Sequence, residues 1–406
     1  MHPITIRYPF RPVRRSLATG QVADLFGLGA DEPPHIVAEN VELDIRPGDL
    51  VLVSGPSGSG KSSLLREAGR QFSAVDAMKL KLPDVPLVDA LSGPVEERLG
   101  LLAACGLSEA RLVLRTPAEL SDGQRYRFRL AFALGRFACG SPLNEGKGVE
   151  HFVLADEFAA NLDRTLARVL AFNARRLVTR TGVGMLLATT HDDMTADLRP
   201  DLRVQCLGDG VIRQIRDVRA RDPRPISFAG ELRVEDGSVA DWEYFARWHY
   251  RSHRLAFVKR VVLLKRRDEP IGICVLTAPA AALGLRTRYF GLTAPRSRVA
   301  LSALNEQLWL LSRVVLHPTY RGAGLAAGFV REACRTCPVP WIETLTAMGH
   351  ANPIFDRAGF VRVGVVRKPD AAGYGGQYGP RGRCNAQTMA KGRYSEPVYY
   401  VFDNRR

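Results

Sequence analysis

Short apolar runs recur along the first half of the chain. They lie at residues 50–53 (LVLV), 152–155 (FVLA) and 183–189 (VGMLLAT). Runs of this length, bounded by glycine or acidic residues, are typical of strands buried in a parallel sheet. Helix-like stretches lie between them, for example at 62–72 and 124–137. This alternation predicts a parallel α/β sheet over roughly residues 36–215.

The second half follows a different pattern. An aromatic helix candidate at 241–250 precedes two strand-like segments, 257–265 and 271–277, which the polar turn RRDEP joins. Between the halves, two prolines stand among arginines in RDVRARDPRPISF, a composition typical of a linker. The predicted organisation is a first domain at 1–220, a linker at 221–234 and a second domain at 235–406.

Composition indicates a folded protein that does not cross a membrane. Of the 406 residues, 46% are hydrophobic and 24% are charged, which is typical of globular domains. The longest apolar stretches are well short of the ~20 residues of a membrane-spanning helix. The first fifteen residues, MHPITIRYPFRPVRR, lack the apolar core of a signal peptide, so we expect a cytoplasmic protein.

The cysteines favour reduced thiols over a disulfide framework, because the seven are scattered along a chain without a signal peptide. Cys334 and Cys337 form a CxxC pair, but no second pair stands at ligand spacing. A zinc site at this pair is therefore disfavoured.

The net charge of +15 is unevenly distributed. Residues 225–406 hold 27 Lys and Arg against 14 Asp and Glu, a net of +13, while residues 1–224 carry only +2. A strongly basic half is suited to an anionic partner such as nucleic acid, a CoA thioester or a membrane surface. A merely basic solvent-exposed surface is the alternative.

A phosphate-binding loop follows the first apolar run. The segment from Gly55 to Ser62, GPSGSGKS, fits the pattern G-x-x-x-x-G-K-[ST]. Such a loop turns backbone N–H groups toward phosphates, its lysine reaches the β- and γ-phosphates, and its last hydroxyl binds Mg²⁺. We predict ATP and Mg²⁺ as ligands. The predicted nucleotide contacts are Gly55, Ser57, Gly58, Gly60, Lys61, Ser62 and Ser63.

Two carboxylates end the second apolar run, in His151-Phe-Val-Leu-Ala-Asp156-Glu157. Asp156 suits a Mg²⁺-coordinating role together with Ser62, and Glu157 suits the base that orients or deprotonates the attacking water. The phosphate loop upstream makes this assignment more specific than a strand followed by two acids would be alone.

Three further motifs, one between the phosphate loop and Asp156 and two after Glu157, make the first half resemble the ABC ATPase family. They are Leu120-Ser121-Asp122-Gly123-Gln124, close to the family's LSGGQ signature; Ala160-Asn161-Leu162-Asp163, similar to its D-loop; and Thr190-His191-Asp192, like its switch histidine. The resemblance implies that His191 contacts the γ-phosphate. It also implies that two chains form a homodimer, in which Ser121, Gly123 and Gln124 of one copy face the ATP of the other. Asp163 is a further nucleotide-binding residue that the resemblance implies.

The chain departs from the family pattern in places. Asp122 replaces a glycine of the signature, and no glutamine stands at an obvious position for the Q-loop, through which transporters contact their membrane subunits. Coupling to transport is therefore in doubt. Phe26 is a candidate for the aromatic residue that stacks on adenine, with a core position as the alternative.

The second half resembles the GNAT acetyltransferase family. Arg321-Gly322-Ala323-Gly324-Leu325-Ala326 fits [RQ]-x-x-G-x-[GA] after a predicted strand, and 352–360 resembles the family's late helix ending in Gly-Phe. The resemblance implies a mixed-sheet α/β domain that binds acetyl-CoA or another acyl-CoA through Arg321, Gly322, Gly324 and Ala326. Phe355 stands where many members have a proton-donating tyrosine, and a phenyl ring cannot donate a proton.

A narrower resemblance concerns phage Mom DNA-modification proteins, which are GNAT-fold enzymes that alter adenine. It rests on Trp248-His249-Tyr250, Leu311-Ser312-Arg313 and Gly349-His350. It implies that His249, Tyr250, Arg313 and His350 cluster at a catalytic site. Each of these residues also has an ordinary structural explanation, in the core, in an ion pair or in a loop.

The leading hypothesis is an α/β chain with a P-loop ABC ATPase domain followed by a GNAT-fold transferase domain that modifies nucleic acid. Interleaved aromatics and arginines in WHYRSHR and YGGQYGPRGR support a nucleic-acid partner, since bases stack on aromatic rings. The alternatives are an ATP-regulated N-acetyltransferase for a protein or small amine, a non-catalytic binding or sensing module, and the ATP-binding subunit of a transporter.

Overall fold

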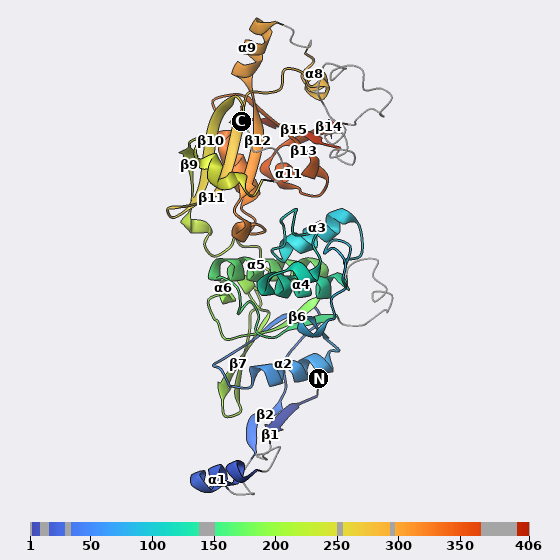
Figure 1. The fold of residues 1–406 in the computed structure, drawn as a ribbon, viewed down its shortest axis with the longest axis vertical. Helices are drawn as coiled ribbons and strands as arrows, with labels where there is room; N and C mark the ends of the chain where they lie inside the picture. The colour runs from blue at the N-terminus through green and yellow to red at the C-terminus, as the bar shows by residue number, and fades with distance from the viewer. Residues whose placement is uncertain are drawn as a thin grey trace. The chain divides into compact units, whose positions relative to one another are not determined.

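The chain divides into two compact units. The computed structural model describes residues 2–8, 16–28, 34–137, 151–249, 255–292, 297–366 and 396–405. Unit 1 comprises Met1–Pro94 and Leu101–Ser227, and unit 2 comprises Val95–Gly100 and Phe228–Arg406. Each unit contains its own sheet (Figure 1).

The main sheet of unit 1 has six strands in the order β4-β5-β6-β3-β7-β8, and β1 and β2 form a separate antiparallel pair. The five strands from β4 to β7 in this order run parallel, and only β8 is antiparallel. The predicted parallel α/β sheet is thus confirmed. The strands are β1 (Ile4–Tyr8), β2 (His35–Val41), β3 (Leu50–Ser54), β4 (Val75–Asp76), β5 (Phe152–Ala155), β6 (Gly184–Thr189), β7 (Leu202–Gly208) and β8 (Val211–Arg216).

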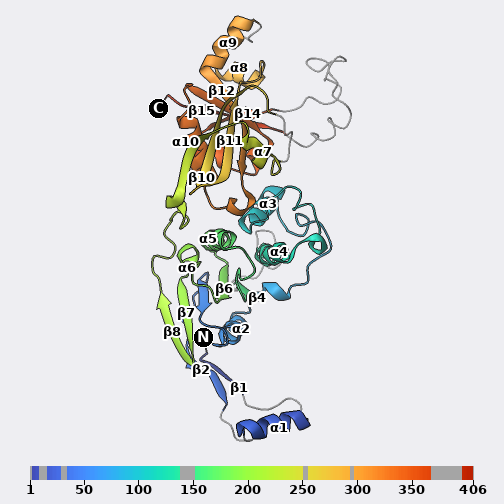
Figure 2. The ribbon, with the colours of Figure 1, turned by 60° about the vertical axis from the view of Figure 1, so that its left-hand side comes forward.

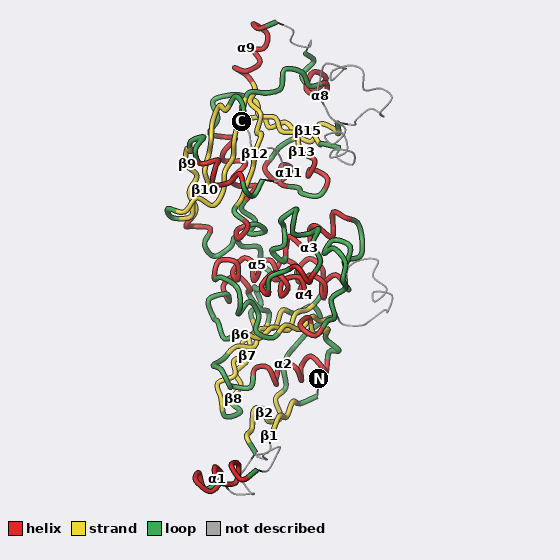
Figure 3. Tube along the Cα trace, in the orientation of Figure 1, coloured by secondary structure: helices red, strands yellow, loops and turns green. Residues whose placement is uncertain are grey.

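Helices lie on both faces of the unit 1 sheet (Figure 3). One face is covered by α2, and the other by α4 and α5 (Figure 1). The helices up to residue 227 are α1 (Leu17–Phe26), α2 (Lys61–Gln71), α3 (Val95–Ala104), α4 (Asp122–Gly135), α5 (Arg164–Thr181) and α6 (Thr195–Leu198).

Apolar packing of α2 against the sheet fixes the helix that follows the phosphate loop. Leu64 and Leu65 are fully buried in one cluster with strand residues such as Val53 and Leu186. At Gly69 a Cβ atom would lie 2.5 Å from Leu154 Cδ1, so the helix approaches β5 too closely for a side chain there. This close packing holds α2 against the sheet.

Unit 2 contains a seven-stranded sheet in the order β14-β15-β13-β12-β11-β10-β9. All neighbouring strands are antiparallel except β12 and β13, which are parallel over three residue pairs. The strands are β9 (Leu232–Gly237), β10 (Val258–Arg266), β11 (Glu269–Thr277), β12 (Leu308–Leu316), β13 (Trp341–Thr346), β14 (Val361–Val365) and β15 (Val398–Asp403). The first residues of β9 thus fall within 221–234, the predicted linker.

Helices α7 and α10 cover opposite faces of this sheet (Figure 2). Trp242 and Phe245 of α7 pack on Val261 and Val275, whereas Phe329 of α10 lies against the other face. The predicted helix at 241–250 is shorter than expected, since α7 ends at Ala246. The helices are α7 (Asp241–Ala246), α8 (Gly284–Tyr289), α9 (Arg298–Gln307), α10 (Ala326–Arg335) and α11 (Ile354–Ala358).

Within the described ranges, every helix is too short or too polar to cross a bilayer.

Candidate functional site

Three loops of unit 1 meet at one edge of its sheet. The neighbouring strands β5, β6 and β3 are parallel, so the loops that follow them leave the same edge. The phosphate loop follows β3, Asp156 and Glu157 follow β5, and His191 follows β6. Motifs separated by more than a hundred residues are therefore placed side by side, as open parallel sheets do at their ligand sites.

The phosphate loop needs glycine for steric reasons. Gly60 has φ = 84°, and a Cβ there would lie 2.0 Å from Val37 Cγ1. Gly55 has φ = 148°, and its Cβ would lie 2.2 Å from the carbonyl oxygen of Cys206. The loop is thus wedged between β2 and β7, and its path is open only to residues without side chains.

Lys61 is held inside the curve of this loop. Its Nζ donates to the carbonyl oxygen of Pro56 at 2.5 Å, and the residue is only 9% exposed. The hydroxyl and the N–H of Ser59 also donate to Pro56 O, at 2.9 and 3.3 Å. A cation tied to a single neutral carbonyl is well placed to exchange it for a phosphate oxygen, which is a stronger acceptor.

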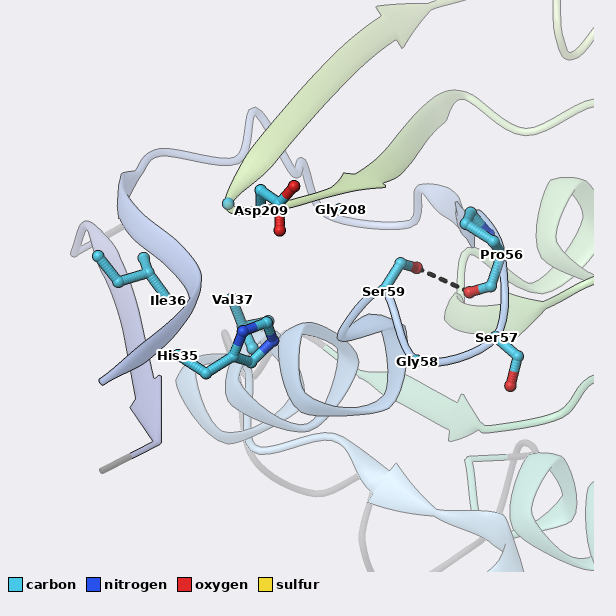
Figure 4. Close-up of a pocket in the computed structure, with 10 residues that line it drawn as sticks. His35, Ile36, Val37, Pro56, Ser57, Gly58, Ser59, Gly208 and Asp209 are labelled. Carbon is cyan, nitrogen blue, oxygen red and sulfur yellow. Dashed lines mark hydrogen bonds between the residues drawn. The ribbon is translucent and has the colours of Figure 1, made fainter. Parts of the chain in front are cut away.

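A cavity of about 260 Å³ adjoins the loop (Figure 4). Its walls are residues 35–37 of β2, 56–59 of the phosphate loop and 208–210 of the β7–β8 turn. In Figure 4 the His35 side chain projects from β2 between the β1–β2 pair and α2, and Asp209 stands at the turn. The cavity therefore extends from the phosphate loop toward β2, where the rest of a nucleotide has room.

Tyr8 is a residue of this region that sequence reasoning missed. It pairs with His35 across the β1–β2 ladder, and its hydroxyl lies 2.7 Å from Ser63 Oγ in the first turn of α2. Phe26, the predicted adenine-stacking residue, lies at the end of α1 and is 76% exposed. In the sequence, Tyr8 stands only at the end of a short alternating segment. That pattern indicates a strand but does not show which strand pairs with it, so it does not single out Tyr8.

The turn after β5 holds Asp156 and Glu157 in an unusual backbone conformation. Glu157 has φ = 50° and Ala159 has φ = 57°, both in the left-handed region that non-glycine residues rarely adopt. The N–H of Glu157 donates to Asp156 Oδ1 at 3.0 Å. Asp156 is partly buried and Glu157 is exposed at the sheet edge. Strained backbone of this kind persists only where the surroundings fix it.

Ion pairs fix the loop after β6 on both sides. His191 is exposed, and the two residues that follow it are anchored to different elements. Asp192 pairs with Arg203 of β7 at 2.7 Å, and Asp193 makes a two-pronged pair with Arg164 of α5, in which Nε donates to Oδ2 at 2.9 Å. The backbone that follows His191 is thereby tied to β7 and α5.

The signature motif begins α4. Ser121 caps the helix by accepting from Gln124 N–H, while the Gln124 side chain accepts from Ser121 N–H at 3.1 Å. Asp122 extends into solvent and pairs with Arg125 at 3.2 Å. A Cβ at Gly123 would lie 3.3 Å from Leu162 Cδ2, so the start of α4 packs tightly on the segment before Asp163. Asp163 in turn caps α5 by accepting from Leu166 N–H at 2.9 Å.

Known proteins match the chain over its first half. The lipoprotein-releasing system ATP-binding protein LolD of Novosphingobium aromaticivorans is 30% identical over 243 residues, which cover 50% of this chain and 96% of LolD. The aliphatic sulfonates import ATP-binding protein SsuB 1 of Streptomyces avermitilis is 34% identical over 244 residues, 54% of this chain and 86% of SsuB 1. The chain belongs to the ABC ATPase family.

No protein-family model matches the chain. Among solved structures, the dimeric ABC transporter cassette MJ0796 aligns with 53% of this chain and 97% of its own, at 20% identity and a TM-score of 0.36. The ABC ATPase assignment therefore concerns roughly half of the chain and rests on sequence identity.

Outside the ABC ATPase unit, the Arg321 loop connects β12 to α10. Gly322 and Gly324 have φ of 87° and 78°, which explains the glycines at both positions. The Arg321 side chain donates to two backbone carbonyls, Leu316 O at 3.0 Å and Trp248 O at 3.3 Å. Arg321 thus braces the loop, and Ala326 is the first residue of α10.

The aromatic segment after α7 carries His249. Its ring contacts Trp242 edge to face, with centroids 5.6 Å apart. Arg247 lies 4.6 Å from the ring centroids of both Tyr244 and Trp248. Tyr250 lies outside the described residues.

Arg313 and His350 have different described partners. Arg313 Nη1 donates to Ser312 O at 2.8 Å, and His350 Nε2 lies 2.8 Å from Glu396 O. None of these contacts joins His249, Arg313 or His350 to another of the three, so the predicted cluster remains a prediction.

The remaining unit 2 predictions concern Phe355 and the CxxC pair. Phe355 is buried against Phe360 and Tyr400, with ring centroids 5.3 and 5.6 Å away. Cys334 and Cys337 are buried, and burial raises the pKa of both thiols. Across the described part of the chain, no group of three or more His, Cys, Asp or Glu side chains is arranged to hold a metal ion.

Proposed function

We propose that unit 1 binds and hydrolyses ATP with Mg²⁺, and that two copies of the chain form the complete site. The observation that carries the proposal is the strand order β5-β6-β3, which brings Lys61, Glu157 and His191 to one sheet edge. The identity to ATP-binding proteins over the same residues supports it.

Each residue of the edge has a role in this proposal. Lys61 exchanges the Pro56 carbonyl for a β- or γ-phosphate oxygen, and the first turn of α2 offers backbone N–H groups to the phosphates. Glu157 accepts a proton from the attacking water, whose oxygen bonds to the γ-phosphorus as the bond to ADP breaks. His191 contacts the γ-phosphate from the neighbouring loop.

Ser62 and Asp156 suit Mg²⁺, since both offer the oxygen ligands that this ion prefers. When bound, the ion neutralises charge on the β- and γ-phosphates. Ser62 is in the first turn of α2 and Asp156 directly follows β5, so both belong to the same sheet edge as Lys61.

A Glu157→Gln variant tests the assignment of the base. Phosphate release per chain should fall at least about a hundredfold, because removal of a general base costs about 10²–10⁴ in rate, while ATP binding stays intact. The matched control is Glu42→Gln, which makes the same change at an exposed site at the end of β2. Normal turnover by Glu157→Gln would remove Glu157 as the base.

For unit 2 we infer a GNAT-like transferase that uses an acyl-CoA. The sheet supports this, because β12 and β13 are its one parallel pair among the described strands, and their backbone pairing stops at Leu310 and Glu343 although both strands continue. The left-handed glycines of the Arg321 loop, directly before α10, suit a pyrophosphate at a helix N-terminus.

The substrate that we propose for this unit is nucleic acid. Residues 225–406 carry a net charge of +13, and Tyr244 with Arg247 forms an exposed aromatic–guanidinium pair of the kind that stacks on bases. Nucleosides from cells that express wild type or Gly324→Glu can be compared by mass spectrometry. Identical nucleoside profiles in a host where the wild type is active would count against the proposal.

Three alternatives predict other results. Acetyl-CoA turnover with amine substrates and no affinity for nucleic acid would favour an ATP-regulated N-acetyltransferase. Ligand binding without turnover would favour a sensing module, which the Phe355 position supports. LolD and SsuB 1 are named as release and import ATP-binding proteins, so co-purification with a membrane subunit would favour a transporter role.

A further inference from the structure

The turn that carries Glu157 is strained and is held by two hydrogen bonds from outside it. Glu157 and Ala159, with φ of 50° and 57°, flank Phe158, which is fully buried. Phe158 N–H donates to Ala188 O of β6 at 2.7 Å. Ala159 N–H donates to the hydroxyl oxygen of Tyr126, at 3.0 Å, across 33 residues of sequence. Without these bonds the backbone would relax toward ordinary φ values.

Tyr126 belongs to the helix that begins at Ser121. It lies on α4, five residues after that cap, so its hydroxyl connects the signature helix to the turn after β5. Burial raises the pKa of Tyr126, and the negative charges of Asp156 and Glu157 act in the same direction. The hydroxyl therefore stays protonated and lies within the electrostatic range of both carboxylates.

We propose that Tyr126 is a positioning residue for ATP hydrolysis, which holds Glu157 at the reacting edge by accepting a hydrogen bond from Ala159 N–H. The inference rests on the proposed role of Glu157. Since Ser121 and Gly123 lie at the start of the same helix, a movement of α4 when the signature meets a partner copy would be transmitted to the turn of Glu157 through the Tyr126 hydroxyl.

The test is Tyr126→Phe, which deletes the hydroxyl and keeps the ring. We expect kcat for ATP to fall about ten- to a hundredfold, because small displacements of a catalytic group have effects of this size. KM for ATP should stay within about twofold of the wild-type value, because Lys61 and the phosphate loop are untouched. Unchanged kcat would overturn the proposal.

A loss of folded protein must be distinguished from a loss of positioning. Thr181→Val is the matched control, since it removes another hydroxyl that accepts a backbone N–H, from Val183 at 3.2 Å, at the far end of α5. A fall in kcat that is explained by a lower melting temperature and a smaller folded fraction would also overturn the proposal. Wild-type protein without ATPase activity would instead refute the proposed function.

Ala159→Gly supplies a second readout. Glycine adopts φ = 57° without strain. With glycine at this position, loss of the Tyr126 hydroxyl should therefore change the backbone conformation of the turn less. The double variant Tyr126→Phe/Ala159→Gly should therefore recover part of the kcat lost in Tyr126→Phe. A merely structural contribution from Tyr126 predicts no recovery of kcat per folded chain, and that result would contradict the positioning role.

Discussion

Asp201 forms a buried ion pair in unit 1 and accepts three hydrogen bonds, so its removal is a quantitative test of the fold. Its carboxylate accepts from Leu50 N–H at 2.8 Å, from Arg175 Nη1 at 2.8 Å and from Arg221 Nε at 3.1 Å. Asp201 is 5% exposed and Arg175 is 6% exposed. Asp201→Ala leaves a buried guanidinium and a buried N–H without this acceptor.

The expected cost is large. Breaking a buried pair by removing one partner costs about 3–5 kcal/mol. For a unit of this size, each kcal/mol lowers the melting temperature by about 2–4 °C, so a fall of roughly 6–20 °C follows. A solvent-exposed ion pair contributes only about 0–1 kcal/mol to the free energy of unfolding, so breaking one is a suitable control.

Denaturant titration and calorimetry of the full chain give the measurement. Arg46→Ala is the control, because it breaks the exposed Arg46–Asp44 pair in the same unit. Asp201→Ala should be several kcal/mol less stable than Arg46→Ala. A difference below about 1 kcal/mol would refute the reasoning, because that is the value of a solvent-exposed pair.

The same residue gives a pH dependence with a definite sign. Burial alone raises the pKa of Asp201, but the hydrogen bonds from Arg175 and Leu50 N–H outweigh it, so the pKa is lowered from 3.8. A lowered folded pKa stabilises the fold fully above about pH 4, and this stabilisation is lost as the pH falls through the folded value. The stability gap between wild type and Asp201→Asn should therefore be constant from about pH 5 to about pH 7 and should shrink below about pH 4.

Three further predictions concern the two units. Gly60→Ala should weaken ATP binding more than Gly58→Ala. Both glycines have φ near 80°, but only at Gly60 would a Cβ meet Val37, 2.0 Å away. Equal losses of ATP affinity in a binding titration would contradict the steric argument. Arg164→Ala should slow ATP turnover several-fold with little change in melting temperature, since it releases Asp193 and the loop that carries His191. Unchanged turnover would show that the pair has no part in positioning. Nucleic-acid binding by the full chain should fall steeply with salt, as counterion release requires, and salt-independent binding would argue against phosphate contacts by unit 2.

Local sequence motifs predicted most of the elements that form the nucleotide site of unit 1. The strand at 50–53, the glycine loop and the helix after it follow from short-range patterns, and the structure has β3 at Leu50–Ser54 and α2 at Lys61–Gln71. The requirement for glycine at Gly60 depends on local φ as well as on Val37. Patterns of this kind are visible in sequence because neighbouring residues determine them.

Contacts between distant segments were not predictable in the same way. Tyr8 meets Ser63, and Tyr126 meets Ala159, only because the sheet brings their elements together. A tyrosine in a helix or a strand has no local signature for such a hydroxyl contact. The end of α7 at Ala246 was also missed, because the aromatic pattern continues into Trp248 beyond the helix.

The central claim is that two copies of this chain close on ATP and hydrolyse it through Glu157. The most direct test is light scattering of purified Glu157→Gln during gel filtration, with and without ATP and Mg²⁺. The account predicts a monomer without nucleotide and a stable dimer of twice that mass with ATP, because binding is retained while hydrolysis is slow. A variant that binds ATP yet stays monomeric at all protein concentrations would contradict it.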